Sequence, residues 1–353
     1  FKNFIAKGKV KKLEVELFSD VNLTNVSLGF FADKSDILIK NIFGLLGDIK
    51  ISDGDIKLNL EDGIKLNSNF NSKFDFNEEQ IIKYAKLSRN LNLLNNIKKI
   101  KADLNNSLFV ELDKTYKVLN YNYDFLGKIE EGKYKLKKIV KNNFIKEDFD
   151  KIYFSDFNIK SNFKPKNISV ESDGKYSFNE INFYKINIGS NIKSDKTNLR
   201  LDFDYANNFE IGLINYKKPK KSVANVIFYL EKNNKDLKIN KFNYKEKNNS
   251  IKINDLILRE KKFFKFNKIE IKTLNNDFII QNNKKITIKG DKFDATNLIK
   301  IFDNQEKENR LKAINNAIEI DFKNIKIPMS EKLENFKLIG EINKGQFTKI
   351  SSK

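Results

Sequence analysis

The residues best placed for chemistry are two carboxylates, Asp291 and Asp294, which follow a strand-like stretch near the C-terminus. Paired carboxylates can act as a general acid and base. Aspartate at a junction between a strand and a helix is, however, a common turn or capping residue. We interpret both residues in that structural sense. Asp53, Asp55 and Asp62 flank predicted hairpin turns and lack the spacing of an EF-hand loop.

The chain contains no His and no Cys. This composition excludes Ser-His-Asp and Cys-His catalysis, most zinc sites and the usual proton shuttle near neutral pH. The sequence also has no GxGxxG, Walker A or GxSxG motif. We therefore predict a protein that is not an enzyme and has no cofactor or metal.

The net charge of +20 raises the question of a polyanionic partner. Only four of the 67 basic residues are Arg, the residue favoured for bidentate contacts with phosphates and bases. Lys, Asn, Ile and Phe are abundant together, which is typical of AT-rich genomes. Phe263, Phe264 and Phe266 lie among lysines and suggest a base-stacking surface. The same pattern is typical of a half-buried strand, so we predict no nucleic-acid partner. The run Lys217–Lys221 reads as a solvated loop that can attract anionic lipid.

The elements that carry these residues show alternation with a period of two, which predicts strands with one buried face. The alternation is clearest from Asp48 to Phe76, where Asp53-Gly54 and Asp62-Gly63 predict two turns. The apolar positions of this stretch are expected to share one face: Ile49, Ile51, Ile56, Leu58, Leu60, Ile64, Leu66 and Phe70.

The same pattern recurs along the chain, with strand centres roughly 10–15 residues apart. We predict a mainly β fold, a long antiparallel meander of amphipathic strands forming one extended body over residues 1–353. Residues 77–100 predict a helical insert, because Asn77 and Gln80 form a capping box and the apolar spacing is helical. A second helical stretch is expected from Ala295 to Phe302, followed by a polar loop over Asn304–Arg310.

A strand that is apolar on one face must bury that face against another layer. The partner can be a second sheet, the interior of a closed barrel, or a ligand held in a curved groove. Composition does not separate the three arrangements, and periodicity alone favours an ordinary dry core.

The C-terminal part carries a more specific signal. The strand Ile286–Lys289 leads into Gly-Asp-Lys-Phe-Asp-Ala over residues 290–295. This segment resembles a recurring element of the AsmA-like superfamily, in its YhdP-like branch, which is related to TamB and to bridge-like lipid-transfer proteins. The strand Ile318–Ile327 and the hairpin Phe336–Lys349, with Gly340 and Gly345 at its turns, also resemble that family. The resemblance covers residues 284–353.

The resemblance implies a Gram-negative envelope protein with a β body in the periplasm. Its hydrophobic groove would carry phospholipid between the inner and outer membranes for outer-membrane biogenesis, with partners in either membrane or in the envelope. The eight apolar residues from Ile49 to Phe70 are the expected groove lining. The chain has no initiator Met, no signal peptide and no apolar run of about 18 residues. We therefore expect a fragment whose inner-membrane anchor lies outside it. The alternatives are a structural or adhesive envelope β protein with a dry core and, third, a Lys-rich nucleic-acid-binding surface.

Overall fold

The computed structural model describes residues 4–18, 21–61, 63–85, 95–140, 144, 147–234, 236–259, 262–298, 315–344 and 346–352. These residues are mainly β, and one α-helix lies among them. The predicted fold class is therefore confirmed. The chain divides into two compact units: unit 1 is Phe1–Ile139 with Asp150–Ser194, and unit 2 is Val140–Phe149 with Asp195–Lys353.

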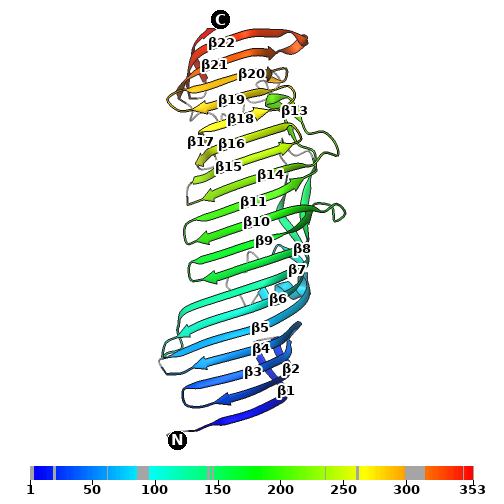
Figure 1. Ribbon diagram of the computed structural model, residues 1–353, viewed down its shortest axis with the longest axis vertical. Coiled ribbons are helices and arrows are strands. Elements are labelled where there is room, and N and C mark those ends of the chain that lie inside the picture. The colour runs from blue at the N-terminus through cyan, green and yellow to red at the C-terminus, as the bar shows by residue number, and fades with distance from the viewer. Residues whose placement is uncertain are drawn as a thin grey trace. The chain divides into compact units, whose positions relative to one another are not determined.

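Unit 1 is an antiparallel meander whose strands lie side by side in chain order (Figure 1). Strands β7 and β8 contact each other, because Gly132 on β7 faces Phe154 on β8 and Lys128 on β7 forms an ion pair with Asp156 on β8. The strands are β1 (Ala6–Phe18), β2 (Val21–Ala32), β3 (Asp36–Leu46), β4 (Ile49–Asn59), β5 (Ile64–Asn77), β6 (Ile97–Leu112), β7 (Val118–Val140), β8 (Phe149–Lys164), β9 (Asn167–Ser177) and β10 (Tyr184–Lys193).

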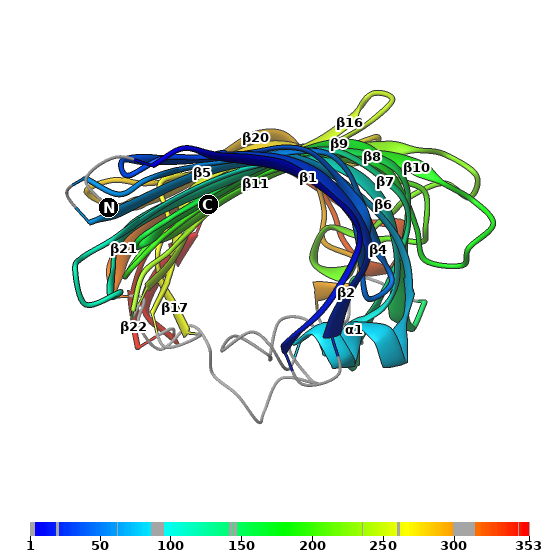
Figure 2. The same ribbon diagram turned by 90° about the horizontal axis from the view of Figure 1, so that it is seen from below.

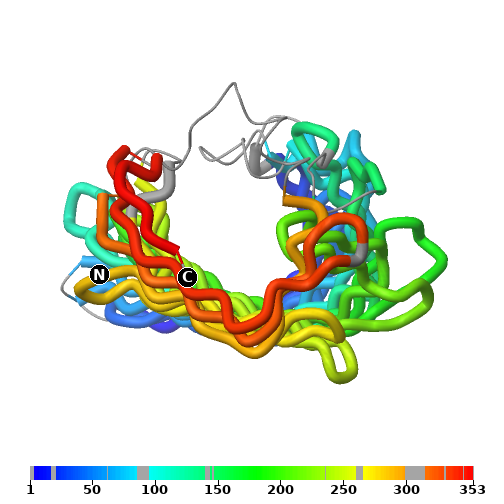
Figure 3. The backbone as a smooth tube through the Cα atoms, turned by 90° about the horizontal axis from the view of Figure 1, so that it is seen from above, coloured from blue at the N-terminus to red at the C-terminus, as the bar shows by residue number. Residues whose placement is uncertain are grey.

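Unit 2 continues with β11 (Thr197–Tyr205), β12 (Glu210–Ile211), the 3-10 helix η1 (Gly212–Ile214), β13 (Tyr216–Lys217), β14 (Ala224–Lys232), β15 (Asp236–Glu246), β16 (Asn249–Arg259), β17 (Lys262–Lys265), β18 (Lys268–Lys272), β19 (Asp277–Asn282), β20 (Ile286–Asp294), β21 (Asn316–Lys326), the 3-10 helix η2 (Pro328–Ser330), β22 (Lys332–Asn343) and β23 (Gln346–Ser352). Most neighbours pair antiparallel, and β12 pairs only with β13 in a separate two-stranded sheet. Figure 3 shows that the C-terminal strands of this unit are bent along their length.

One pair in unit 2 departs from the predicted antiparallel meander, because β20 and β21 run parallel. A parallel pair needs a long connection that returns the chain to the same end of the sheet. The segment between Asp294 and Asn316 provides that length. The ammonium groups of Lys285 and Lys289 contact the carboxylate of Glu319 across this pair and lower its pKa to about 2.

A column of bulges bends the first four strands of unit 1. Lys12, Asn25, Asn41 and Asp53 lie inside β1 to β4 with φ between 53° and 58°, at breaks in the pairing register. Asn and Asp tolerate this left-handed conformation better than most residues, and a bulge adds one residue and bends its strand. Figure 2 shows the resulting curvature of these strands.

The turn predicted at Asp53-Gly54 is therefore wrong. Asp53 forms the bulge inside β4, and the turn that joins β3 to β4 lies at Gly47 and Asp48, where Gly47 has φ 55°. The sequence signal was ambiguous because turns and bulges use the same residue types. The second predicted turn does lie between β4 and β5; Asp62 itself falls outside the described residues.

The capping box at the start of the helix is confirmed. The Asn77 backbone N–H donates to the Gln80 side chain, and the Gln80 N–H donates to Oδ1 of Asn77, both at 3.0 Å. The helix α1 covers Glu78–Ala85, and residues 86–94 fall outside the described residues. Residues 97–100, expected in the helix, lie in β6 because their alternation continues into that long strand.

The C-terminal predictions have mixed outcomes. The expected strand over Ile318–Ile327 is β21, and the expected hairpin is β22 with β23. Gly340 lies inside β22 opposite Ile350, so its placement at a turn is wrong, and Gly345 falls outside the described residues. Most of the expected helix over 295–302 and the expected loop over 304–310 also fall outside the described residues. No helix within the described ranges is long and apolar enough to span a membrane.

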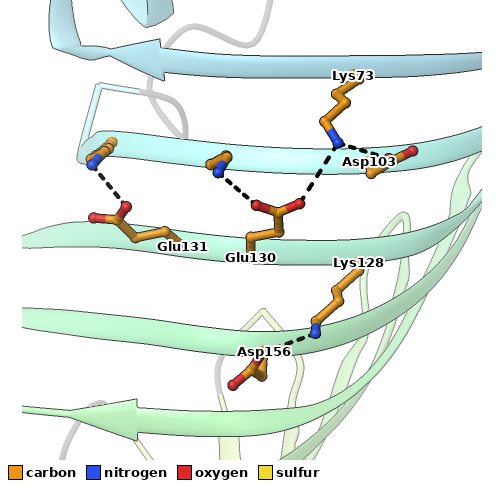
Figure 4. Close-up of polar contacts among 8 residues, drawn as sticks. Lys73, Asp103, Lys128, Glu130, Glu131 and Asp156 are labelled. Atoms are coloured by element: carbon orange, nitrogen blue, oxygen red, sulfur yellow. Dashed lines mark hydrogen bonds and ion pairs between the residues drawn. The ribbon is translucent and has the colours of Figure 1, made fainter.

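One face of the unit 1 sheet carries a ladder of ion pairs across β5 to β8 (Figure 4). Lys73 on β5 contacts Asp103 on β6 at 3.4 Å and Glu130 on β7 at 4.0 Å. The ammonium of Lys101 lies 2.8 Å from Glu130 and lowers the pKa of that carboxyl. Exposed pairs of this kind contribute little to stability. They identify the face of the sheet that is suited to water.

Candidate apolar binding site

The opposite face of unit 1 carries the eight apolar residues singled out from the sequence. Ile51 pairs with Ser72 and Ile56 pairs with Ser68, and both serines share one face of β5. The bulge at Asp53 accounts for this, because one extra residue brings the odd-numbered Ile51 and the even-numbered Ile56 to the same side. All eight residues therefore lie on one face of β4, β5 and their connection.

None of the eight is buried. Seven are half-buried, and Leu60 is 37% exposed. In a sandwich of two sheets these positions would form a dry core. Phe70 borders a cavity, and Asn106 on the neighbouring strand makes that cavity partly polar. Asn106 is buried, donates to Oγ of Ser72 at 2.9 Å and accepts from the hydroxyl of Tyr123 at 2.8 Å.

A smaller apolar cavity of about 200 Å³ lies elsewhere in unit 1, where β6, β7, β8 and β10 contribute side chains. Its wall includes Phe154 and the buried Phe157, whose rings meet edge to face at 5.1 Å. Gly132 leaves space for the Phe154 side chain, which passes directly over it.

The larger apolar cavity is in unit 2 and has a volume of about 430 Å³. Cross-strand rows on β11, β14, β15 and β16 form its floor, and in one row Phe203, Val226, Tyr244 and Ile251 stand opposite one another in turn. Every lining residue is apolar or aromatic: Phe144, Phe203, Tyr205, Phe209, Ile211, Val226, Phe228, Ile239, Phe242, Tyr244, Ile251 and Ile253.

The floor has a closed end and an open end. Tyr205, Val226, Tyr244 and Ile251 are buried. The adjacent positions on the same strands, including Phe228, Phe242 and Ile253, are only half-buried. The cavity therefore runs from a covered region of the sheet face to one that is accessible.

Two chain segments cover the closed end. Phe209 and Ile211 come from the segment that contains the small β12–β13 hairpin, and Phe144 comes from the segment between β7 and β8. The Glu210 N–H donates to the carbonyl of Phe144 at 2.9 Å, and the Asn208 side chain donates to Glu147 at 2.9 Å. These contacts join the two covering segments to each other.

Buried polar groups fasten the hairpin to the sheet. The hydroxyls of Tyr216 and Tyr244 share a hydrogen bond of 2.9 Å, and burial raises the pKa of Tyr244. The buried ammonium of Lys218 donates to the carbonyls of Ala206 at 2.8 Å and Ser222 at 2.6 Å. Burial lowers the pKa of Lys218. Hydrogen bonds of buried groups specify one arrangement, because breaking them leaves polar atoms unpaired.

A buried carboxylate lies beside this closed end. Glu246 is 0% exposed and follows Tyr244 on the same face of β15. Asn249 donates to its Oε2 at 2.7 Å, while Oε1 has no hydrogen-bond partner among the described residues.

The two carboxylates first considered for chemistry have structural roles. Asp294 is buried and accepts hydrogen bonds from the N–H and hydroxyl of Thr296 and from the Asn215 side chain, which ties η1 to the end of β20. Burial is the largest influence on the pKa of Asp294 and acts to raise it. The hydrogen bonds together outweigh burial, so the pKa lies below its usual value. Asp291 is exposed and pairs with Lys323 at 2.7 Å.

Other chemical sites find little support in the described part of the chain. No group of three or more acidic residues there could hold a metal ion. Phe266, one of the three rings that suggested a base-stacking surface, is buried. The side chains of Phe263 and Phe264 lie outside the described part.

Sequence reasoning identified the apolar face but not the cavity in unit 2. Phe203, Phe228 and Phe242 were visible as members of alternating strands, and their aromatic density was the available signal. The cover could not be predicted, because β12 and β13 have two residues each and no periodicity.

No family model, curated protein or solved structure matches this chain. The AsmA-like resemblance of residues 284–353 stays a prediction.

Proposed function

We propose that this chain is a lipid-binding module whose apolar sheet face holds the acyl chains of phospholipid and lets them move along it. The main supporting observation is the cavity of about 430 Å³ in unit 2, which is lined only by apolar and aromatic side chains. Unit 1 has half-buried apolar residues of its own on β4 and β5.

The mechanism is passive. Apolar side chains replace the membrane interior around a hydrocarbon chain, and each methylene removed from water contributes about 0.8 kcal/mol. Successive rows of similar side chains offer similar binding energy, so a bound chain can shift along the face without a large barrier. No residue acts chemically on the lipid.

The placement of this activity between the inner and outer membranes, with an anchor in the inner membrane, is a proposal that rests on the AsmA-like resemblance of residues 284–353. The positive charge of the chain suits contact with anionic head groups.

The C-terminal strands of unit 2 favour a second candidate function, a structural β protein with a dry core. Phe278, Phe293 and Phe322 pack with ring centroids 5.4–5.5 Å apart, and Phe278 and Phe322 are buried. Here the sheet face is filled by its own aromatic rings. The two candidates differ in whether the rest of the face takes up lipid.

The test is transfer of a fluorescent phospholipid between donor and acceptor vesicles. Leu66→Lys places a charge on the apolar face of β5, whereas Asn67→Lys places the same charge on the opposite face of the same strand. The proposal predicts loss of transfer for Leu66→Lys and normal transfer for Asn67→Lys. Absence of transfer by the unaltered protein, or equal effects of the two changes in folded variants, would count against it.

A further inference from the structure

The unit 2 cavity accepts hydrocarbon rather than a polar ligand. Its only polar side-chain atoms are the hydroxyls of Tyr205 and Tyr244, and both are already engaged. The Tyr205 hydroxyl donates to the carbonyl of Asn208 at 3.3 Å, and the Tyr244 hydroxyl bonds to Tyr216. A polar group placed inside would lose its water without gaining a prepared partner. The occupant is therefore apolar over the enclosed length.

The size of the cavity indicates one chain rather than two. A volume of about 430 Å³ lies at the low end of the range for small-molecule pockets. If a methylene takes up about the 30 Å³ that a water molecule occupies in the liquid, the cavity holds about 14 carbons. Phe209 and Ile211 on one side and Phe228 and Phe242 on the other enclose that chain between the cover and the floor.

Positive charge gathers where strand β14 begins and strand β15 ends, beside the closed end of the cavity. Lys220 and Lys221 precede β14, and Lys247 lies in the turn after β15. Asn225 pairs with Lys245, so the start of β14 and the end of β15 lie side by side. All three lysines are exposed, and the described residues provide none of them with an ion-pair partner. The nearby Glu246 side chain is fully buried, so it does not lie on the surface with these lysines.

We propose that the unit 2 cavity is a seat for one acyl chain of an anionic phospholipid, whose head-group phosphate lies against Lys220, Lys221 and Lys247. This proposal rests on the proposed lipid-binding function and adds a defined position and a preference of head group. The cover formed by Phe144 and the β12–β13 hairpin distinguishes this seat from the half-exposed face of unit 1, along which lipid passes.

The test uses the full chain with vesicles that contain phosphatidylglycerol carrying a diazirine on one acyl chain. After irradiation, mass spectrometry of peptides locates the crosslinks. The expected result is labelling concentrated on the peptides of β14 to β16. Ile253→Trp, which fills the open end of the cavity, should lower this labelling about tenfold, equivalent to 1.4 kcal/mol of binding. Asn67→Trp, at an exposed position on the opposite face of β5, should leave it unchanged. Ile239→Trp is a second filling variant should Ile253→Trp fail to fold.

The head-group preference is tested with phosphatidylcholine carrying the same diazirine chain. Phosphatidylglycerol should label the seat several-fold more strongly, and a triple change of Lys220, Lys221 and Lys247 to Gln should remove the difference. Equal labelling by both lipids would overturn the role of the lysines. Crosslinks spread evenly over both units would overturn the seat while leaving the proposed function intact, whereas no crosslinks from either lipid would contradict both.

Discussion

Replacing Phe242 and Phe322 with alanine, one at a time, should show which ring lines a lipid-binding cavity and which belongs to a packed core. Phe322 is 2% exposed and stacks with Phe293 at 5.4 Å. Its loss should cost about 3–5 kcal/mol, which is the usual range for a buried Phe→Ala change. For a unit of this size that corresponds to a fall in melting temperature of about 10 °C. Lipid binding by the folded protein should remain, because Phe322 does not line the cavity.

Phe242 should behave in the opposite way. It is half-buried and lines the cavity floor, so its replacement should cost only about 1 kcal/mol of stability. The missing ring removes part of the wall that contacts the chain, and a loss of about 1.4 kcal/mol would weaken binding tenfold.

Unfolding is followed by circular dichroism, because the chain has no Trp, and binding by equilibrium titration with a fluorescent acyl lipid. Phe347→Ala, at a position 48% exposed, is the control and should change stability by no more than about 0.5 kcal/mol. If Phe242→Ala destabilises the protein as much as Phe322→Ala and leaves lipid binding unchanged, the cavity is part of an ordinary core and the reasoning fails.

Three further predictions concern the fold that holds this site. Tyr216→Phe or Tyr244→Phe alone should cost about 1–3 kcal/mol, because one buried hydroxyl loses its partner, and the double variant should cost less than the sum in a double-mutant cycle. Glu319 should titrate near pH 2 by NMR rather than near 4.5; since its folded pKa is lowered, its stabilising effect is present above about pH 4.5 and is lost as the pH falls toward 2. Gly290→Ala should disrupt the pairing of β19 with β20, because its Cβ would lie 2.3 Å from a backbone oxygen, whereas Gly29→Ala has no atom closer than 3.9 Å. Thermal melts would compare the two variants, and equal melting temperatures would contradict this expectation.

The sequence predicted the strands well because alternation depends only on which face each residue occupies. Ile49 and Ile51, and then Ile56 and Leu58, were correctly placed on one face, although the reason was a bulge at Asp53 rather than a turn. Local residue type cannot separate the two, since both need a left-handed conformation. The register with β3 and β5 decides between them, and register depends on the neighbouring strands.

The cavity was beyond prediction for a similar reason. Alternation in β14 and β15 shows that Phe228 and Phe242 face the same way, but it does not show which part of the face is covered. The cover depends on hydrogen bonds between residues far apart in sequence, such as Asn215 to Asp294. The parallel pairing of β20 with β21 was also invisible, because parallel and antiparallel strands can share the same alternation.

The most direct test of the central claim, that the apolar face holds phospholipid, is mass spectrometry of lipid extracted from the natively purified protein. The account predicts phospholipid at a near-stoichiometric level, reduced in Ile253→Trp and retained in Asn67→Lys. Protein that is folded and free of lipid, and that takes up none from vesicles, would contradict it.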